Sequence, residues 1–146
     1  MLVFVYGTLR KGDCRAGILD DYKCVAEEAY LQGFTMLDLG AFPGIIPINI
    51  PTDHSIIRGE LYEIDKDCLQ ILDNIEGYFE DNPQDSLYLR QKVTVDVYTD
   101  ESEDTYEDVF TYVLNYSSKT RYGEAPIIKS GNWFDKSKQI LISRTT

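Results

Sequence analysis

One segment of the sequence, DKDCLQILDNIEG at residues 65–77, has the pattern of a long α-helix, and it stands among segments patterned as β-strands. Asp65 is a suitable N-cap residue, and Gly77 is suited to end the helix. The strand-like segments are residues 2–6, 24–39, 56–64, 88–98 and 108–116. One long helix set among strands favours an α+β fold, with a strongly curved sheet or small mixed β-barrel and a few helices.

Glycine, proline and acidic residues mark where these segments should break. Gly33 divides residues 24–39 into two strands or bends a single one, and AFPGIIP at 41–47 should interrupt regular structure. Residues 100–107, DESEDTYE, should form the turn of a hairpin between the last two long strands. A glycine within a strand, as at Gly59, indicates the close approach of another backbone.

The length and charge of the chain limit its organisation and its partners. A chain of 146 residues is the size of one domain, so we predict a single domain over residues 1–146. A net charge of −11 argues against binding to nucleic acid or to anionic membranes. The acidic residues gather at 80–85 and 100–108, where we expect solvated loops.

The three cysteines indicate a reducing compartment. They form no CxxC pair, and no basic segment precedes the apolar N-terminal run, as it would in a signal peptide. We therefore predict a cytoplasmic location. No apolar run approaches the roughly 20 residues of a membrane span. The acidic pI argues against non-specific self-association but leaves a specific homodimer open.

Glu76 departs from the amphipathic pattern of the predicted helix. At about 100° per residue, one arc should be buried and the other solvated. The expected buried arc holds Cys68, Leu69, Ile71, Leu72 and Ile75, and the expected solvated arc holds Lys66, Asp67, Gln70, Asp73 and Asn74. Glu76 falls on the apolar arc, in the last helical turn. Burial and the negative end of the helix dipole should both raise the pKa of this carboxyl group.

Spacing alone leaves two interpretations of Glu76 open. Either the helix frays there, so that the side chain reaches water or a backbone donor, or Glu76 is a general base whose raised pKa suits proton transfer near neutral pH.

Several other chemistries find little support in the sequence. The lone histidine, His54, lies in a predicted loop, and without HExxH or paired cysteines we predict no metal site. A Cys–His or Ser–His nucleophile would have to use His54, which we interpret as solvated. GTLRKG lacks the GxxxxGK[ST] pattern and GxGxxG is missing, so nucleotide binding through these motifs is unsupported.

Five motifs in order resemble those of the gamma-glutamylcyclotransferase-like family, particularly its gamma-glutamylamine cyclotransferase branch. They are VYGTLRKG, GELYEID, LDNIEGY, SLYLRQKVTV and SGNW, which together extend from Val3 to about Phe134. The resemblance implies a mixed α+β fold around a small barrel. It also implies a cofactor-independent reaction in which the α-amine of a gamma-glutamyl substrate attacks its own side-chain carbonyl and releases 5-oxoproline and an amine.

The resemblance assigns roles to particular residues. It places the catalytic glutamate at Glu76 and so favours the general base over the frayed helix end. Backbone N–H groups of the loop at residues 6–9 should bind the substrate. The residues expected to bind substrate are Tyr6, Gly7, Thr8, Leu9, Tyr78, Tyr88 and Arg90. Trp133 is also expected near the cavity or among its supports.

The loop at residues 6–9 has a physical interpretation of its own. A strand that ends in Tyr-Gly-Thr-Leu can leave successive N–H groups aimed at one point, where an anion or oxyanion accepts them. Gly7 permits close approach because it has no Cβ. Arg10 and Lys11 should be solvated, although both add positive potential.

Two alternatives to this function stay open at the level of sequence. The same cavity could act on a different acyl-amine compound, including a gamma-glutamyl protecting group, because a fold does not fix its substrate. The protein could instead be a non-enzymatic module that binds a small metabolite, in which case Glu76 would recognise an amine. Under the family resemblance, the YGTLRKG loop differs from the longer apolar version of the glutathione-acting branch, which favours a gamma-glutamyl amine over free glutathione.

Overall fold

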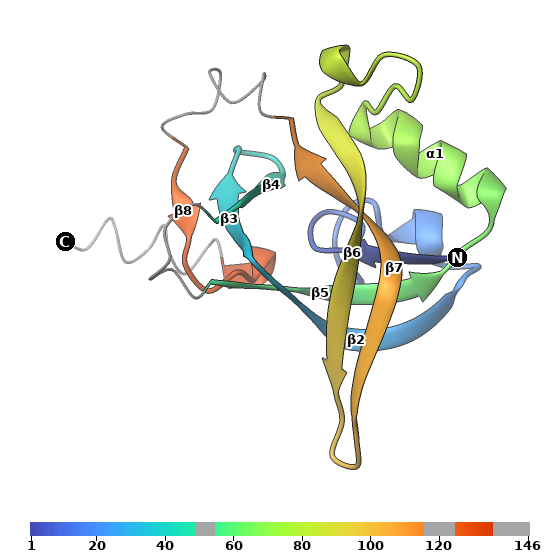
Figure 1. The fold of residues 1–146 in the computed structure, drawn as a ribbon, viewed down its shortest axis with the longest axis vertical. Helices are drawn as coiled ribbons and strands as arrows, with labels where there is room; N and C mark the ends of the chain where they lie inside the picture. The colour runs from blue at the N-terminus through green and yellow to red at the C-terminus, as the bar shows by residue number, and fades with distance from the viewer. Residues whose placement is uncertain (49–54, 116–124, 136–146) are drawn as a thin grey trace.

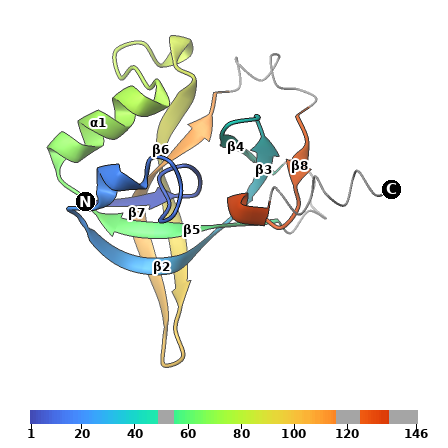
Figure 2. The ribbon, with the colours of Figure 1, turned by 180° about the vertical axis from the view of Figure 1, so that it is seen from behind.

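The computed structural model describes residues 1–48, 55–115 and 125–135, and a closed five-stranded barrel is its central feature. The barrel strands, in spatial order, are β1 (Leu2–Val5), β5 (Ile56–Glu63), β2 (Lys23–Gln32), β6 (Tyr88–Tyr98) and β7 (Glu103–Leu114). A second sheet has the order β4 (Pro43–Pro47), β3 (Phe34–Asp38) and β8 (Ile127–Ile128). Helix α1 (Lys66–Glu76) lies beside the barrel, on the side away from this second sheet (Figures 1 and 2). The predicted α+β fold with a small mixed barrel is confirmed.

Strand β1 closes the barrel and is buried over most of its length. Val3, Phe4 and Val5 are buried, as the continuous apolar run predicts. β1 pairs antiparallel with β5 and makes one parallel pairing with β7, between Val3 and Phe110. The chain leaves β1 at Tyr6, so the loop that follows starts from one of the most constrained strands of the barrel.

The predicted helix is confirmed, with two errors in its faces. The Asp65 carboxylate accepts a hydrogen bond from Cys68 N at 2.8 Å, and Gly77 ends the helix at a φ of 66°. Ile71, expected to be buried, is 48% exposed, whereas Asp73, expected in solvent, is 4% exposed. The helix buries a face centred between Cys68 and Asp73, because polar groups of β6 and β7 hold the Asp73 carboxylate.

Two other sequence predictions were wrong. Residues 43–47 form β4 instead of interrupting regular structure, because the two prolines lie at the ends of an edge strand, where the missing N–H groups are tolerated. The turn of the long hairpin spans only residues 99–102, since β7 begins at Glu103. Pairing with β6 therefore overrides the low strand propensity of the acidic segment. Of the two alternatives left open at Gly33, the structure has two strands, with a φ of 90° at this glycine between β2 and β3.

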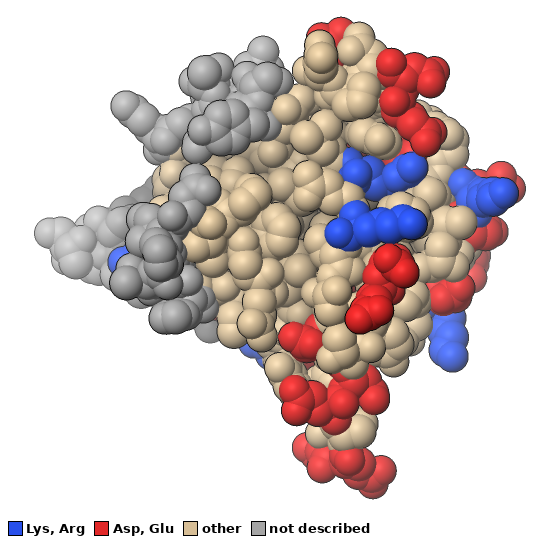
Figure 3. Space-filling model, viewed as in Figure 1, with Lys and Arg blue, Asp and Glu red and all other residues tan. Residues whose placement is uncertain are grey.

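Three short 3₁₀ helices complete the described elements: η1 (Ala16–Leu19), η2 (Pro83–Asp85) and η4 (Trp133–Asp135). The first of them follows the β1 loop and leads toward β2. Acidic side chains gather at the projecting end of the β6–β7 hairpin (Figure 3). Among the described residues, no helix has the length and apolar character needed to cross a membrane.

Candidate active site

A cavity of about 150 Å³ lies where the β1 loop, the end of α1 and the start of β6 meet. Of the predicted site residues, the structure brings six to its lining: Tyr6, Gly7, Thr8, Leu9, Glu76 and Tyr88. Phe42, Pro43 and Ile75 are among the apolar residues that complete the wall. A cavity of about this size can hold a benzene ring, so a five-membered lactam ring is of suitable size.

Glu76 supplies the carboxylate of this cavity. Its side chain is half-buried at the C-terminal end of α1. Loss of hydration on burial raises the pKa of Glu76 to about 7, and the positive charge of Arg15 opposes this rise. Among the described residues, none makes a hydrogen bond or ion pair with the Glu76 carboxylate. A carboxyl group of this kind can gain or lose a proton near neutral pH.

Arg15 is the cation of the cavity lining. It follows the β1 loop, and its backbone N–H donates to Thr8 O at 2.9 Å. Its side chain is exposed, so it stands where the cavity meets solvent. Arg15 was not among the predicted site residues, because nothing in the local sequence pattern distinguishes it from other surface cations.

Three tyrosines line the cavity with their hydroxyl groups bound to protein acceptors. Tyr6 donates to Tyr112 O, and Tyr88 donates to Pro43 O, both at 2.6 Å. Tyr112 donates to Asp73 Oδ1 at 2.6 Å. Burial is the main cause that raises the pKa of Tyr6 and of Tyr112, so both keep their protons at neutral pH. Glu76 is therefore the lining group best suited to accept a proton.

The β1 loop presents backbone donors that the described protein does not use. No described residue accepts a hydrogen bond from the N–H groups of Gly7, Thr8 or Leu9. Thr8 and Leu9 are buried, and buried N–H groups without an acceptor are rare. A Cβ on Gly7 would lie 2.8 Å from Pro43 Cγ, so only glycine lets β4 approach the loop this closely. The three N–H groups are suited to an anion or an oxyanion.

Tyr78 and Arg90 do not line the cavity. Arg90 Nη1 donates to Asp73 Oδ2 at 2.5 Å, and its guanidinium lies 5.1 Å from the centre of the Tyr78 ring. Asp73 in turn accepts from Tyr112, which does line the cavity. Arg90 and Asp73 thus tie the last turns of α1 to β6 and β7 behind the wall that contains Glu76. Direct substrate contact by Tyr78 and Arg90 stays a prediction.

Tyr112 and Asp73 also belong to this region, although they were not among the predicted site residues. Tyr112 was one of eleven tyrosines, and only the pairing of β7 with its neighbours brings it to the cavity. His54, the one histidine considered as a nucleophile's partner, lies outside the described residues. Within the part of the chain that the structure describes, no group of three or more His, Cys, Asp or Glu side chains could hold a metal ion.

Comparison with known proteins gives one consistent result. The family model described as gamma-glutamyl cyclotransferase, AIG2-like, matches residues 3–135. The gamma-L-glutamyl-butirosin B gamma-glutamyl cyclotransferase of Niallia circulans is 29% identical over 84% of this chain and 73% of that protein. Gamma-glutamylaminecyclotransferase B of Danio rerio is 27% identical over 83% of this chain and 60% of that protein.

A solved structure extends the comparison to the fold. An AIG2-like protein from Mus musculus superimposes with a TM-score of 0.64 and 24% identity, covering 88% of this chain and 86% of the other. At this level of identity the likeness concerns the fold alone.

Proposed function

The chain belongs to the gamma-glutamyl cyclotransferase, AIG2-like, family, and on this premise we propose that it converts a gamma-glutamyl amine or peptide into 5-oxoproline and a free amine. The α-amine of the glutamyl group attacks the side-chain carbonyl of the same molecule, which forms the lactam C–N bond. The original amide C–N bond then breaks, and the leaving nitrogen takes a proton.

The observation that carries this proposal is the position of Glu76, a carboxyl group with a pKa of about 7 in a cavity whose loop has three N–H groups unused by any described residue. The substrate ammonium has a pKa of at least about 8, against about 4.3 for an ordinary glutamate. Transfer of its proton to an ordinary glutamate would cost about 5 kcal/mol. Transfer to Glu76 costs only about 1.4 kcal/mol for a pKa gap of about one unit.

Glu76 then serves twice in the proposed mechanism. It first accepts one proton of the ammonium, which frees the attacking lone pair, and it later donates that proton to the leaving nitrogen. The second proton, which the attacking nitrogen loses as the lactam forms, returns to the freed carboxylate and leaves with the released amine. The N–H groups of Gly7, Thr8 and Leu9 bind the glutamyl carboxylate or polarise the carbonyl oxygen. Tyr6 and Tyr88 shape the wall, since both hydroxyl groups already donate to backbone carbonyls.

Because the nucleophile is part of the substrate, the protein has to lower the activation barrier mainly by positioning. Holding the amine and the carbonyl in a near-attack arrangement is worth on the order of 7–11 kcal/mol of barrier. The proposed reaction therefore requires no covalent enzyme intermediate and no cofactor. We place it in the cytoplasm, in keeping with the cysteine content, with a small molecule as substrate.

The amine half of the substrate is the open part of the proposal. The Niallia circulans relative is named for gamma-L-glutamyl-butirosin B, and the Danio rerio relative is named for gamma-glutamylamine. The same chemistry on another acyl amine is thus one alternative, and metabolite binding without turnover is another.

The test is 5-oxoproline release from a panel of gamma-glutamyl amines, gamma-glutamyl dipeptides and gamma-glutamyl-lysine. We expect release from at least one class, with gamma-glutamyl amines preferred over free glutathione. Stoichiometric binding of a gamma-glutamyl compound in calorimetry, with no heat of turnover and no 5-oxoproline, would instead identify a binding protein.

The pH dependence of the reaction should report on Glu76. Protonated Glu76 cannot accept the ammonium proton, so kcat/KM should fall tenfold per pH unit below about pH 7. Arg15→Gln removes the charge that lowers this pKa and should move the midpoint to higher pH. Lys11→Gln is the matched control, because Lys11 pairs with Glu27 away from the cavity. A midpoint near pH 4.5 in the wild type would contradict the assignment.

A further inference from the structure

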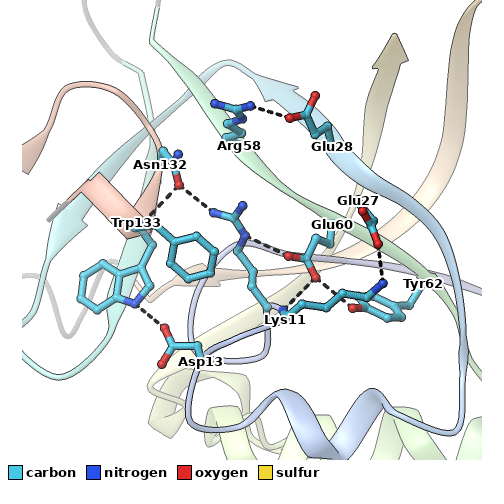
Figure 4. Close-up of polar contacts among 11 residues, drawn as sticks. Lys11, Asp13, Glu27, Glu28, Arg58, Glu60, Tyr62, Asn132 and Trp133 are labelled. Atoms are coloured by element: carbon cyan, nitrogen blue, oxygen red, sulfur yellow. Dashed lines mark hydrogen bonds and ion pairs between the residues drawn. The ribbon is translucent and has the colours of Figure 1, made fainter. Parts of the chain in front are cut away.

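Glu60 is a buried carboxylate on β5 that receives three hydrogen bonds. It is 3% exposed, and its Oε1 accepts from Lys11 N at 3.0 Å and from the Tyr62 hydroxyl at 2.8 Å. Its Oε2 accepts from Arg10 Nε at 3.3 Å. Two of these donors belong to the loop that follows β1, so β5 holds this loop through one side chain (Figure 4). A buried charge is tolerated only with such partners.

Arg10 is buried, contrary to the expectation that it would be solvated. It is 6% exposed, and Nη1 donates to Asn132 Oδ1 at 2.8 Å. The ring centre of Phe134 lies 4.1 Å from its guanidinium carbon. The planar guanidinium thus links β5 to residues 130–135, because it offers donors in two directions. Lys11, by contrast, is exposed and pairs with Glu27.

Residues 130–135 are themselves fixed to the barrel and to the loop. Gly131 O accepts from Arg58 N at 2.8 Å, which ties this segment to β5. Gly131 has a φ of 68°, and any Cβ there would overlap Ile56 O, so glycine is required. Trp133 Nε1 donates to Asp13 Oδ2 at 3.0 Å, which makes a second tie to the loop (Figure 4).

Residues 10–13 of the loop, which Glu60, Asn132 and Trp133 hold, are hydrogen-bonded to the part of the loop that lines the cavity. Arg10 N donates to Gly7 O at 3.0 Å, and Asp13 N donates to Arg10 O at 3.0 Å. Gly7, Thr8 and Leu9 line the cavity, whereas Arg10 and Lys11 line a separate surface groove formed with β2 and β5. A shift of Arg10 would therefore pass through a single turn to the cavity-lining residues 7–9.

We propose that Arg10 is a positioning residue, which with Glu60 and Asn132 holds the β1 loop so that the N–H groups of Gly7, Thr8 and Leu9 converge on the substrate. This inference rests on the proposed function for its effect on catalysis. Its structural part, the rigidity of the loop, can be measured without any substrate.

The test uses the double variant Arg10→Met with Glu60→Gln. Removing both charges together leaves no unpaired buried ion, so the variant should fold, and the amide oxygen introduced at position 60 can still accept from Lys11 N and Tyr62. Order parameters of the Gly7, Thr8 and Leu9 amides, from ¹⁵N relaxation, should fall from about 0.85 to below about 0.6. KM should rise at least about tenfold, and kcat/KM should fall roughly a hundredfold. The midpoint of the pH dependence of kcat/KM should not change, because Glu76 is not substituted.

The matched control is Arg58→Gln with Glu28→Gln, an exposed ion pair that joins β5 to β2 at 2.7 Å and does not involve the β1 loop. It should leave both the order parameters and KM at wild-type values. A folded Arg10→Met/Glu60→Gln protein with wild-type loop order parameters would overturn the proposal. Loop order parameters that fall while a wild-type KM is retained would overturn its catalytic part. If the wild type itself releases no 5-oxoproline, the proposed function fails, and the relaxation data still decide whether Arg10 orders the loop.

Discussion

Replacing Glu76 with Gln is expected to lower kcat/KM roughly 10²–10⁴-fold, the usual contribution of a general acid–base group. Glutamine has the shape of glutamate but cannot take the ammonium proton. The defect should appear in kcat, since proton transfer occurs in the transition state and substrate contacts with the loop remain. The measurement is 5-oxoproline release at pH 8 from the best substrate of the panel. Turnover at the wild-type rate would contradict the role of Glu76.

The stability of the same variant serves as its folding control. The folded-state pKa of Glu76 is about 7, above the ordinary value of 4.5, so the folded wild type binds the extra proton between these values. The contribution of protonated Glu76 to the free energy of unfolding of the wild type is therefore fully present below pH 4.5 and is lost as the pH rises through 7. Glu76→Gln avoids this loss and should be more stable than the wild type at pH 8, by up to about 3 kcal/mol. Glu80→Gln, an exposed carboxyl nearby, should change neither rate nor stability.

Replacing Gly59 with Ala should cause the largest loss of stability among small substitutions in the described barrel strands. A Cβ at Gly59 would overlap the Val5 carbonyl oxygen and lie 2.7 Å from Phe4 Cζ. Backbone atoms cannot move aside cheaply, so β1 must shift away from β5. We expect a loss of at least about 3 kcal/mol in the free energy of unfolding, or about 10 °C in Tm. Activity should fall as well, since the β1 loop begins at the next residue after Val5.

The control for Gly59→Ala is Gly17→Ala in η1. A Cβ there would meet its nearest neighbour, Asp20 Oδ2, at 3.8 Å, which is ordinary contact. Thermal unfolding of both variants should show a change only for Gly59. A Gly59→Ala protein with wild-type Tm and activity would mean that β1 and β5 can separate without cost.

The elements that the sequence predicted well are those set by neighbours along the chain. The Asp65 cap, the Gly77 helix end and the break at Gly33 depend on local backbone preferences, which a single sequence displays. Gly59 belongs with them, since a glycine inside a strand is itself a sign of a nearby backbone. β4 and the first part of β7, residues 103–107, were missed because partner strands, rather than local propensity, stabilise them.

The residues of the candidate site were likewise predicted where local sequence determines them and missed where distant segments do. Glu76 stands out from the helix pattern alone, because a carboxylate on an apolar arc conflicts with its neighbours. Asp73 conflicts with nothing in the sequence, since its burial depends on Arg90 and Tyr112 from other strands. From the sequence, Arg10 was likewise expected to be a solvated cation, and only the fold places Glu60 of β5 beside it. The burial of Asp73 and Arg10 depends on contacts between segments that are distant along the chain, and a single sequence does not reveal such contacts.

The single parallel pairing of Val3 with Phe110 also bears on how the protein folds. The first strand of the chain completes the barrel only when it meets a strand formed more than a hundred residues later. Glu76 and the β1 loop can thus be synthesised long before the wall behind them exists. Closure of such a long chain segment is slow, so folding on the scale of milliseconds to seconds is expected. A nascent chain that lacks β7 should expose the apolar residues of β1 to chaperones, and catalytic competence should be among the last properties that it gains.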